Sequence, residues 1–267
     1  MYEVAGVTLG HGGPPVVSGL DLTFESGAVT ALCGPNGAGK STLLAALAGD
    51  LAPRTGVIRL AGHPVAGHSP AALARMRAVL EQSPGLAADF DVTTLAGLSV
   101  PREVPPAAAA RLVRQVLVDL NLSALATASV LTLSGGQRHR AHLARAIAQL
   151  RAGRSLGGGK ALLLDEPTAS LDITHQVTVM EAARQAAAEG AAVIVVLHDL
   201  NLAAAFADRI VILHQGGVAA DGPAATALRS ETLSRVYQSA IDVTHHTGRT
   251  LVVPVYASQP TLQEARQ

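Results

Sequence analysis

The chain has 267 residues, enough for one large α/β domain or two small ones with a substantial buried core. Lys plus Arg and Asp plus Glu both total 20, and with three Phe, three Tyr and no Trp, no nucleic-acid partner is expected. Neither a signal peptide nor a membrane-crossing run of about 18 apolar residues is expected, and the single cysteine, Cys33, fits the end of a buried strand in a reducing cytoplasm.

The first part of the chain is predicted to place strands around a phosphate-binding loop. Residues 3–33 carry short apolar or alternating runs separated by turn clusters, which is typical of strands and hairpins. A buried strand over 28–33 leads into the loop at 34–42 (GPNGAGKST), and an apolar helix over 41–48 follows. This is the strand, loop and helix context in which G-x-x-x-x-G-K-[ST] binds a nucleoside triphosphate.

The loop residues have distinct expected roles at the phosphates. Gly34, Gly37 and Gly39 permit a tight turn whose N–H groups face an anion, and the following helix adds its N-terminal donors. Lys40 is expected to reach the β- and γ-phosphates, and Ser41 to supply a hydroxyl to Mg²⁺. The alternative, a chance glycine-rich turn, is disfavoured by the flanking strand and helix. The predicted ATP site also includes Pro35, Asn36, Ala38 and Thr42.

Helices are predicted to dominate the middle of the chain. After a strand over 55–60, a helical stretch is expected over 70–80, and residues 86–150 are mostly helical. One of these helices begins at Pro105-Pro106 and carries an apolar stripe at helical spacing. Residues 151–160 (RAGRSLGGGK) are predicted to form a flexible loop.

Buried strands return in the last part of the chain. They alternate with helices, which indicates a parallel sheet covered on both faces. These strands are expected at 161–164, 192–197 and 210–213, followed by a helix near 230–237 and a strand at 251–253.

Polar residues follow the buried strands, at the sheet edge where open α/β sheets bind ligands. Asp165 is suited to hold Mg²⁺, and Glu166 to accept a proton from an attacking water, a role worth about 10²- to 10⁴-fold in rate. His198 follows the strand at 192–197. An acidic pair can also be a helix N-cap, but the phosphate loop in the same chain favours catalysis.

The pentapeptide Leu133-Ser134-Gly135-Gly136-Gln137 is the second motif. Ser134 with Gln137 three residues later is typical of a capping box that begins a helix. A capping box does not require the two glycines. Without side chains, they leave the backbone N–H groups at the helix start accessible to an anion. The segment is therefore predicted to contact phosphate.

Together these motifs resemble the ATP-binding subunits of ABC transporters over nearly the whole chain. GPNGAGKST matches Walker A, LSGGQ the signature, LLLDEP Walker B and residues 169–172 the D-loop, which ends at Asp172. Gln82 matches the Q-loop glutamine and His198 the switch histidine. The resemblance implies an α/β fold: a RecA-like P-loop NTPase core with an antiparallel β-subdomain and an inserted helical subdomain. The implied boundaries are 1–240 for the ATP-binding domain, about 83–150 for the helical subdomain and 241–267 for a C-terminal extension.

The resemblance also implies how the sites work. Glu166, His198, Gln82 and Lys40 would be catalytic, and Gln82 would join Ser41 and Asp165 at Mg²⁺. ATP would be clamped in a head-to-tail homodimer, with Ser134 and Gly136 of one copy contacting the γ-phosphate held by the other. His11 stands where the family has an adenine-stacking aromatic residue, and the alternative for it is an exposed loop position.

The implied partners are membrane proteins. Two permease subunits would bind around Gln82 and the helical subdomain, with a periplasmic or lipid-anchored binding protein acting indirectly. The chain would then lie at the cytoplasmic face of the cell membrane.

Longer segments narrow the resemblance to one branch. Residues 77–82, 195–217 and 233–254 look like the ATPases of haem and ferric-siderophore importers, and RAGRSLGGGK is similar to an insertion of the haem importers. Haem import is therefore favoured over siderophore or cobalamin import. A soluble non-transport ABC ATPase and a small-molecule kinase are alternatives that a single cassette with LSGGQ disfavours. The pairs His139/His142 and His245/His246 are predicted to be surface histidines, not metal or haem ligands.

Overall fold

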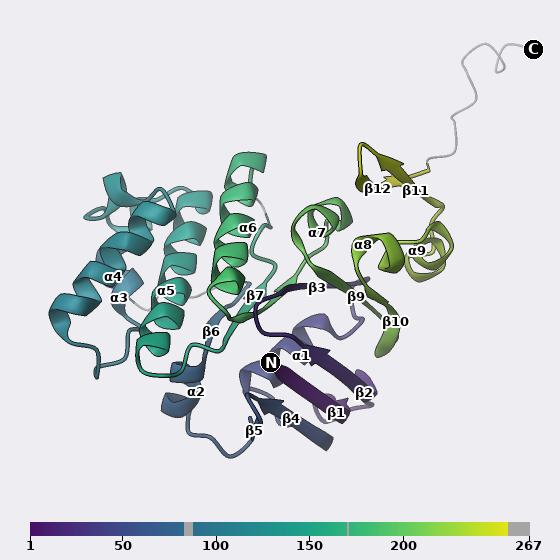
Figure 1. Cartoon of the computed structure of the whole chain (residues 1–267), viewed down its shortest axis with the longest axis horizontal. Coiled ribbons are helices and arrows are strands. Elements are labelled where there is room, and N and C mark those ends of the chain that lie inside the picture. The colour runs from purple at the N-terminus through teal and green to yellow at the C-terminus, as the bar shows by residue number, and fades with distance from the viewer. Residues whose placement is uncertain (83–87, 170, 256–267) are drawn as a thin grey trace, which may run out of the picture.

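A six-stranded sheet forms the centre of the computed structural model, which describes residues 1–82, 88–169 and 171–255 (Figure 1). The strand order is β10-β9-β3-β8-β7-β6, and all neighbours are parallel except β10 and β9. The strands are β3 (Val29–Cys33), β6 (Arg77–Leu80), β7 (Ala161–Asp165), β8 (Ala192–Val196), β9 (Arg209–His214) and β10 (Gly217–Gly222).

Both faces of this sheet are buried because side chains alternate along each strand. Val29, Ala31 and Cys33 of β3 pack against helices on one face, while Leu32 faces the other. On that second face lie α1 (Lys40–Ala48) and an antiparallel sheet of order β2-β1-β4-β5. The antiparallel strands are β1 (Tyr2–Leu9), β2 (Val17–Phe24), β4 (Thr55–Leu60) and β5 (His63–Pro64). The predicted parallel sheet and N-terminal strands are present.

Helices cover the first face, and some of them form a separate lobe at the left of Figure 1. This lobe holds α3 (Val92–Gly97), α4 (Pro106–Asp119), the 3-10 turns Ser123–Leu125 and Val130–Thr132, and the start of α5 (Gly135–Ser155). The helices over the core are α6 (Ile173–Ala188), α7 (Leu200–Phe206), α8 (Ala224–Ala227) and α9 (Ser230–Tyr237). The lobe falls within the predicted helical subdomain, of which residues 83–87 lie outside the described ranges. No helix in the described part of the chain is long and apolar enough to cross a membrane.

The described part of the predicted C-terminal extension is a hairpin of β11 (Ile241–His246) and β12 (Arg249–Pro254). Asn201 on α7 fixes it in place: its amide donates to the Val252 carbonyl at 3.1 Å and its Oδ1 accepts from the Val252 N–H at 2.8 Å. Residues 256–267, the rest of the predicted extension, lie outside the described ranges.

The prediction of a helical stretch over 70–80 is wrong in its second half. α2 (Pro70–Met76) ends before Arg77, and Arg77–Leu80 form β6, the edge strand that pairs with β7. Ala78 and Leu80 are fully buried, so strand pairing and burial outweigh the helical tendency of the preceding residues. A strand of four residues is too short for its alternation to stand out in the sequence.

The predicted flexible loop at 151–160 is also wrong, because α5 continues to Ser155 and two glycines after it, Gly158 and Gly159, are tightly packed. The Gly159 N–H donates to the Arg75 carbonyl at 2.8 Å. A Cβ on Gly158 would lie 2.2 Å from the same oxygen. These glycines therefore serve a close backbone approach rather than mobility.

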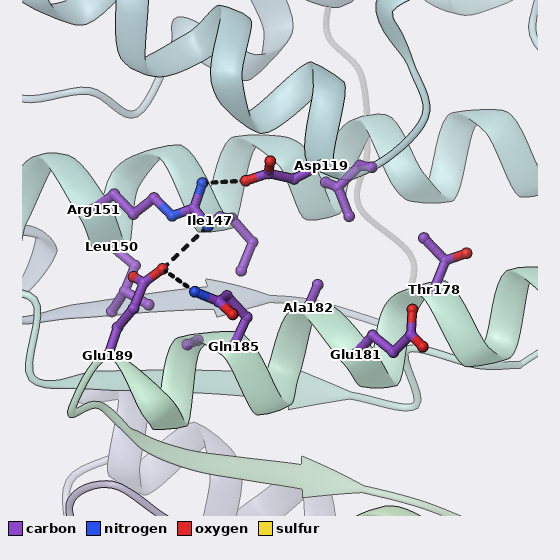
Figure 2. Close-up of a pocket in the computed structure, with 11 residues that line it drawn as sticks. Asp119, Ile147, Leu150, Arg151, Thr178, Glu181, Ala182, Gln185 and Glu189 are labelled. Carbon is purple, nitrogen blue, oxygen red and sulfur yellow. Dashed lines mark hydrogen bonds and ion pairs between the residues drawn. The ribbon is translucent and has the colours of Figure 1, made fainter.

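Arg151 near the end of α5 joins the helical lobe to the core (Figure 2). Its guanidinium lies 2.6 Å from Asp119 at the end of α4 and 3.2 Å from Glu189 just after α6. Gln185 also donates to Glu189, at 3.0 Å. Burial by itself would raise the pKa of Glu189, but the hydrogen bond from Gln185 and the charges of Arg151 and Arg154 outweigh it, so this pKa lies below its usual range.

Arg151→Met is expected to lower the free energy of unfolding by about 1–2 kcal/mol, since Asp119 loses its ion pair and Glu189 keeps only that with Arg154, while solvent screens part of the loss. A carboxyl whose pKa is depressed by folding stabilises the protein above its unfolded pKa, and this contribution is lost as the pH falls through the folded pKa. Urea unfolding between pH 7 and pH 3 should therefore show a smaller loss of stability on acidification in the variant than in the wild type. Equal pH dependence of the two proteins would show that Arg151 does not stabilise these carboxylates.

Candidate nucleotide-binding site

The phosphate loop occupies the turn between β3 and α1, at the carboxyl edge of the parallel sheet. Gly34 has φ = 140°, and a Cβ there would lie 2.2 Å from the Leu213 carbonyl oxygen. Gly39, which precedes α1, has φ = 101°, and a Cβ there would lie 2.6 Å from Val17 Cγ2. Only glycine fits either position. Ala38 is buried and its N–H donates to the Pro35 carbonyl at 3.3 Å, so these two residues shape the loop.

A cleft of about 170 Å³ lies beside this loop. In the described part of the chain its lining comes from the loop, the first turn of α1, one residue before β2 and one after β7: Val16, Asn36, Gly37, Gly39, Lys40, Ser41, Thr42 and Glu166. Val16 was not predicted, because a lone valine before a strand carries no distinctive signal.

Lys40 is held across the loop. Its Nζ donates to the Gly34 carbonyl at 2.8 Å and to the Pro35 carbonyl at 2.9 Å. Burial lowers its pKa, and the negative charge of Glu166 partly opposes this effect. The amine is thus already beside the cleft in which phosphates would lie.

Two oxygen-bearing side chains meet at the start of α1 and the end of β7. Ser41 Oγ donates to Asp165 Oδ1 at 3.3 Å. Burial raises the pKa of Asp165, and the neighbouring Glu166 carboxylate raises it further, whereas the Ser41 hydrogen bond lowers it. A hydroxyl and a carboxylate are the ligands that Mg²⁺ prefers, so these residues fit the ion in chemistry.

Glu166 contacts two side chains that follow other strands of the sheet, Gln82 and His198. Its Oε2 accepts from Gln82 Nε2 at 2.7 Å, after β6, and its Oε1 lies 2.6 Å from His198 Nε2, after β8. Its φ of 47° is rare for a residue with a Cβ and marks a locally strained backbone. The Glu166 side chain is 16% exposed, which leaves it reachable by water. The structure therefore brings the predicted Gln82, Glu166 and His198 together.

The signature residues lie at the start of α5 and form the capping box that the sequence also suggested. Ser134 Oγ accepts from the Gln137 N–H at 3.2 Å, and Gln137 Oε1 accepts from the Ser134 N–H at 3.0 Å. Gly135 and Gly136 occupy the first turn, and a Cβ on Gly136 would lie 3.5 Å from Leu171. Among the described residues, none from Leu133 to Gln137 lines the cleft of the same copy.

Two other predicted positions lie outside the cleft lining of the described chain. His11 is exposed in a turn closed by a 2.9 Å hydrogen bond from the Gly13 N–H to its carbonyl. Asp172 caps α6, accepting from the His175 N–H at 2.9 Å. Ser170, between Asp172 and Walker B in the predicted D-loop, lies outside the described residues.

The prediction that His139 and His142 are surface residues is wrong. His142 is 1% exposed and His139 is partly buried, because α5 is packed on several sides rather than one. Burial lowers the pKa of His142 to about 4, and the charge of Arg145 adds to the effect. Over the described ranges, no three His, Cys, Asp or Glu side chains are grouped to hold a metal. His245 and His246 are exposed.

The parallel sheet, the phosphate loop after β3 and the acidic pair at the end of β7 define a P-loop protein that binds and hydrolyses nucleotides. The chain belongs to the ABC transporter family, whose model matches residues 17–169. This membership confirms both the resemblance and the ATPase assignment.

Curated relatives match most of the chain. The hemin import ATP-binding protein HmuV of Rhodopseudomonas palustris is 44% identical over 246 residues, which are 92% of this chain and 91% of the relative. The protein of the same name from Nocardia farcinica is 44% identical over 92% of this chain and 85% of its own length. The one from Bordetella pertussis is 42% identical over 94% and 98%.

Solved structures show the same fold. One chain of an inward-facing ABC transporter superposes with a TM-score of 0.76 at 24% identity, covering 96% of this chain and 97% of that one. A bacterial ABC transporter cassette with a dimeric structure gives a TM-score of 0.73 at 23% identity, covering 84% and 99%. The predicted fold class, an ABC ATPase fold, is confirmed.

Proposed function

We propose that this chain is the ATP-hydrolysing subunit of an ABC importer that takes up haem. The observation that carries the hydrolytic part is Glu166, held beside the phosphate-loop cleft by Gln82 and His198. Support for haem comes from relatives named for hemin import that match over nine-tenths of the chain.

The side chains of the cleft suit the steps of hydrolysis. Lys40 would exchange its two carbonyl partners for phosphate oxygens, so that its charge lies beside the β- and γ-phosphates. Ser41 and Asp165 would hold Mg²⁺, which when bound supplies positive charge to the phosphates. Glu166 would accept the proton of the attacking water through one oxygen while Gln82 or His198 keeps the other in place.

A homodimer completes this site in the proposal. The signature residues lie at an exposed helix start outside the cleft of their own copy, as a contribution to a second copy requires. Ser134 and Gly136 would then contact the γ-phosphate, and residues such as His11 would lie near the base. ATP hydrolysis would then take place only when the two copies have closed on each other.

The proposed partners are permease subunits in the cell membrane, which the chain would bind at the cytoplasmic face around Gln82 and the helical lobe. A binding protein outside the membrane would act only through the permease. Ferric-siderophore and cobalamin import are the alternatives within the branch, and a soluble ABC ATPase is the alternative from another class.

Transport by the purified complex tests this function. The tagged chain would be isolated from detergent-extracted membranes with its permease and reconstituted in vesicles with ATP on the side that the chain faces. ATP-dependent uptake of haem, with little uptake of cobalamin or a ferric siderophore, is the expected result. Uptake of either of these in place of haem would reassign the substrate, and copurification with no membrane protein would favour the soluble ATPase.

A further inference from the structure

The C-terminal hairpin of β11 and β12 is fixed to helices of the core along both of its edges (Figure 1). Along β11, two N–H groups donate to the hydroxyls of Ser234 and Ser230 on α9, at 3.0 Å and 2.9 Å. Along β12, the Asn201 amide of α7 binds the main chain of Val252 in both directions. The hairpin is thus tied to the helix that follows the predicted switch histidine, His198.

The Asn201 side chain takes the place of a neighbouring strand along β12. In an antiparallel pair, every second residue directs its N–H and C=O away from the partner strand. Val252 is such a residue, since both of these groups bind Asn201. Val252 is buried and belongs to the same apolar cluster as Leu200, so the hairpin also covers the inner face of α7. The position of α7 therefore depends on the hairpin.

The start of α7 is joined directly to His198. Asp199 caps the helix, because its Oδ1 accepts from the N–H groups of Asn201 and Leu202 at 2.8 Å and 3.0 Å. Asn201 thus binds the cap with its backbone and the hairpin with its side chain. Only Asp199 and Leu200 separate it from His198. A shift of Asn201 relative to the hairpin would move the backbone that carries the imidazole.

The His198 ring has few contacts of its own that fix it. Its side chain is 48% exposed, and among the described residues Glu166 is the one hydrogen-bond partner of the ring, at 2.6 Å. Before His198 the backbone is anchored to the sheet, because the Leu197 N–H donates to the Leu32 carbonyl at 3.2 Å. After His198 the anchor is the capped start of α7. The position of the imidazole beside Glu166 therefore depends on how firmly α7 is held.

We propose that Asn201 is a positioning residue for His198, through which the C-terminal hairpin holds the imidazole beside Glu166. This role rests on the proposed function, in which His198 steadies the carboxylate that takes a proton from water. Asn201 is exposed and lies outside the cleft lining of the described chain, so it influences turnover without touching ATP. A displacement of about 1 Å at a reacting group can cost about 100-fold in rate.

Single-turnover hydrolysis by the full-length chain in excess over ATP, with ATP binding measured alongside, tests this role. Asn201→Ala should lower the rate about tenfold and leave the affinity for ATP unchanged. In a chain that already carries His198→Ala, the same substitution should have no further effect, because the ring that Asn201 positions is gone. A general loss of stability would instead lower the rate by the same factor in both backgrounds.

Val252→Pro breaks the same contact from the hairpin side, since proline lacks the N–H that donates to Asn201. It should also slow hydrolysis, and only while His198 is present. Ser230→Ala/Ser234→Ala is the matched control, because it removes hydrogen bonds from the hairpin to α9 and keeps those to Asn201. This control should hydrolyse ATP at the wild-type rate.

Wild-type turnover by Asn201→Ala, a change in ATP affinity alone, or an equal loss of rate with and without His198 would each overturn the positioning role. A loss in the Ser230/Ser234 control as large as that in the Asn201 variant would overturn it as well. Slow hydrolysis by His198→Ala with normal hydrolysis by Asn201→Ala would remove the positioning role and keep the proposed function. Normal hydrolysis by His198→Ala would remove His198 from the hydrolytic site, and the positioning role with it.

Discussion

Glu166→Gln is expected to abolish ATP turnover while ATP binding persists. Glutamine keeps the size of the side chain and one oxygen that can accept from Gln82 Nε2, which lies 2.7 Å from Glu166 Oε2. It cannot take a proton from water, so hydrolysis should fall by about 10²- to 10⁴-fold. With hydrolysis blocked, the ATP-bound dimer should accumulate and elute earlier in size-exclusion chromatography.

Glu181→Gln is the matched control, since Glu181 is an exposed carboxylate on α6 that lines the hollow of Figure 2 and not the phosphate-loop cleft. It should hydrolyse ATP at the wild-type rate. Normal turnover by the Glu166 variant would remove Glu166 from the role of base. Loss of ATP binding in that variant would show that the substitution damages the loop and not the proton transfer.

The second large effect is expected from Ser134→Arg, which should block turnover and leave ATP binding by the single chain intact. Ser134 is exposed at the start of α5, and no signature residue lines the cleft of its own copy in the described structure. A bulky cation there would obstruct a partner copy without touching the nucleotide held in cis. Binding of a fluorescent ATP analogue and phosphate release together measure the two properties.

Ser134 also caps α5, so its replacement removes a cap worth about 0.5–2 kcal/mol. Ser69→Arg controls for this loss, because Ser69 caps α2 through its hydroxyl and lies outside the phosphate-loop cleft. The Ser69 variant should hydrolyse ATP normally. If Ser134→Arg removes ATP binding by the isolated chain, the proposed contact between copies is wrong.

The parts of the fold that could be predicted are those whose sequence signal is local. The phosphate loop needs glycines at Gly34 and Gly39 because their backbone and neighbours exclude a Cβ, so the motif and its conformation arise together. The helix from Pro106 was predictable because proline at its start and the apolar spacing agree. The strands that lead to Asp165 and His198 were predictable from their continuous apolar runs.

The wrong predictions share one cause. At each of these places the structure is decided by packing between segments that are distant in the sequence. β6 exists because Leu80 pairs with Leu164 of β7, which no local pattern states. The glycines after α5 looked mobile, yet Gly158 is fixed against Arg75 of α2. His142 is buried by the elements around α5, although Arg138, Arg140 and Arg145 lie within four residues of it in the sequence.

For the candidate site, the ends of the buried strands placed Glu166 and His198 at one edge of the sheet, and only the family resemblance added Gln82. The parallel sheet supplies the physical reason, since β6, β7 and β8 end at the same edge. The contact of the signature with phosphate stays a prediction, because it joins two copies of the chain.

The dependence of ATP hydrolysis on protein concentration tests that contact most directly. The specific activity of the purified chain should fall as dilution separates the copies, with the fall matching the loss of dimer seen by light scattering or mass photometry. Activity per chain that stays constant in a strictly monomeric sample would contradict the account, because a single copy would then hold a complete hydrolytic site.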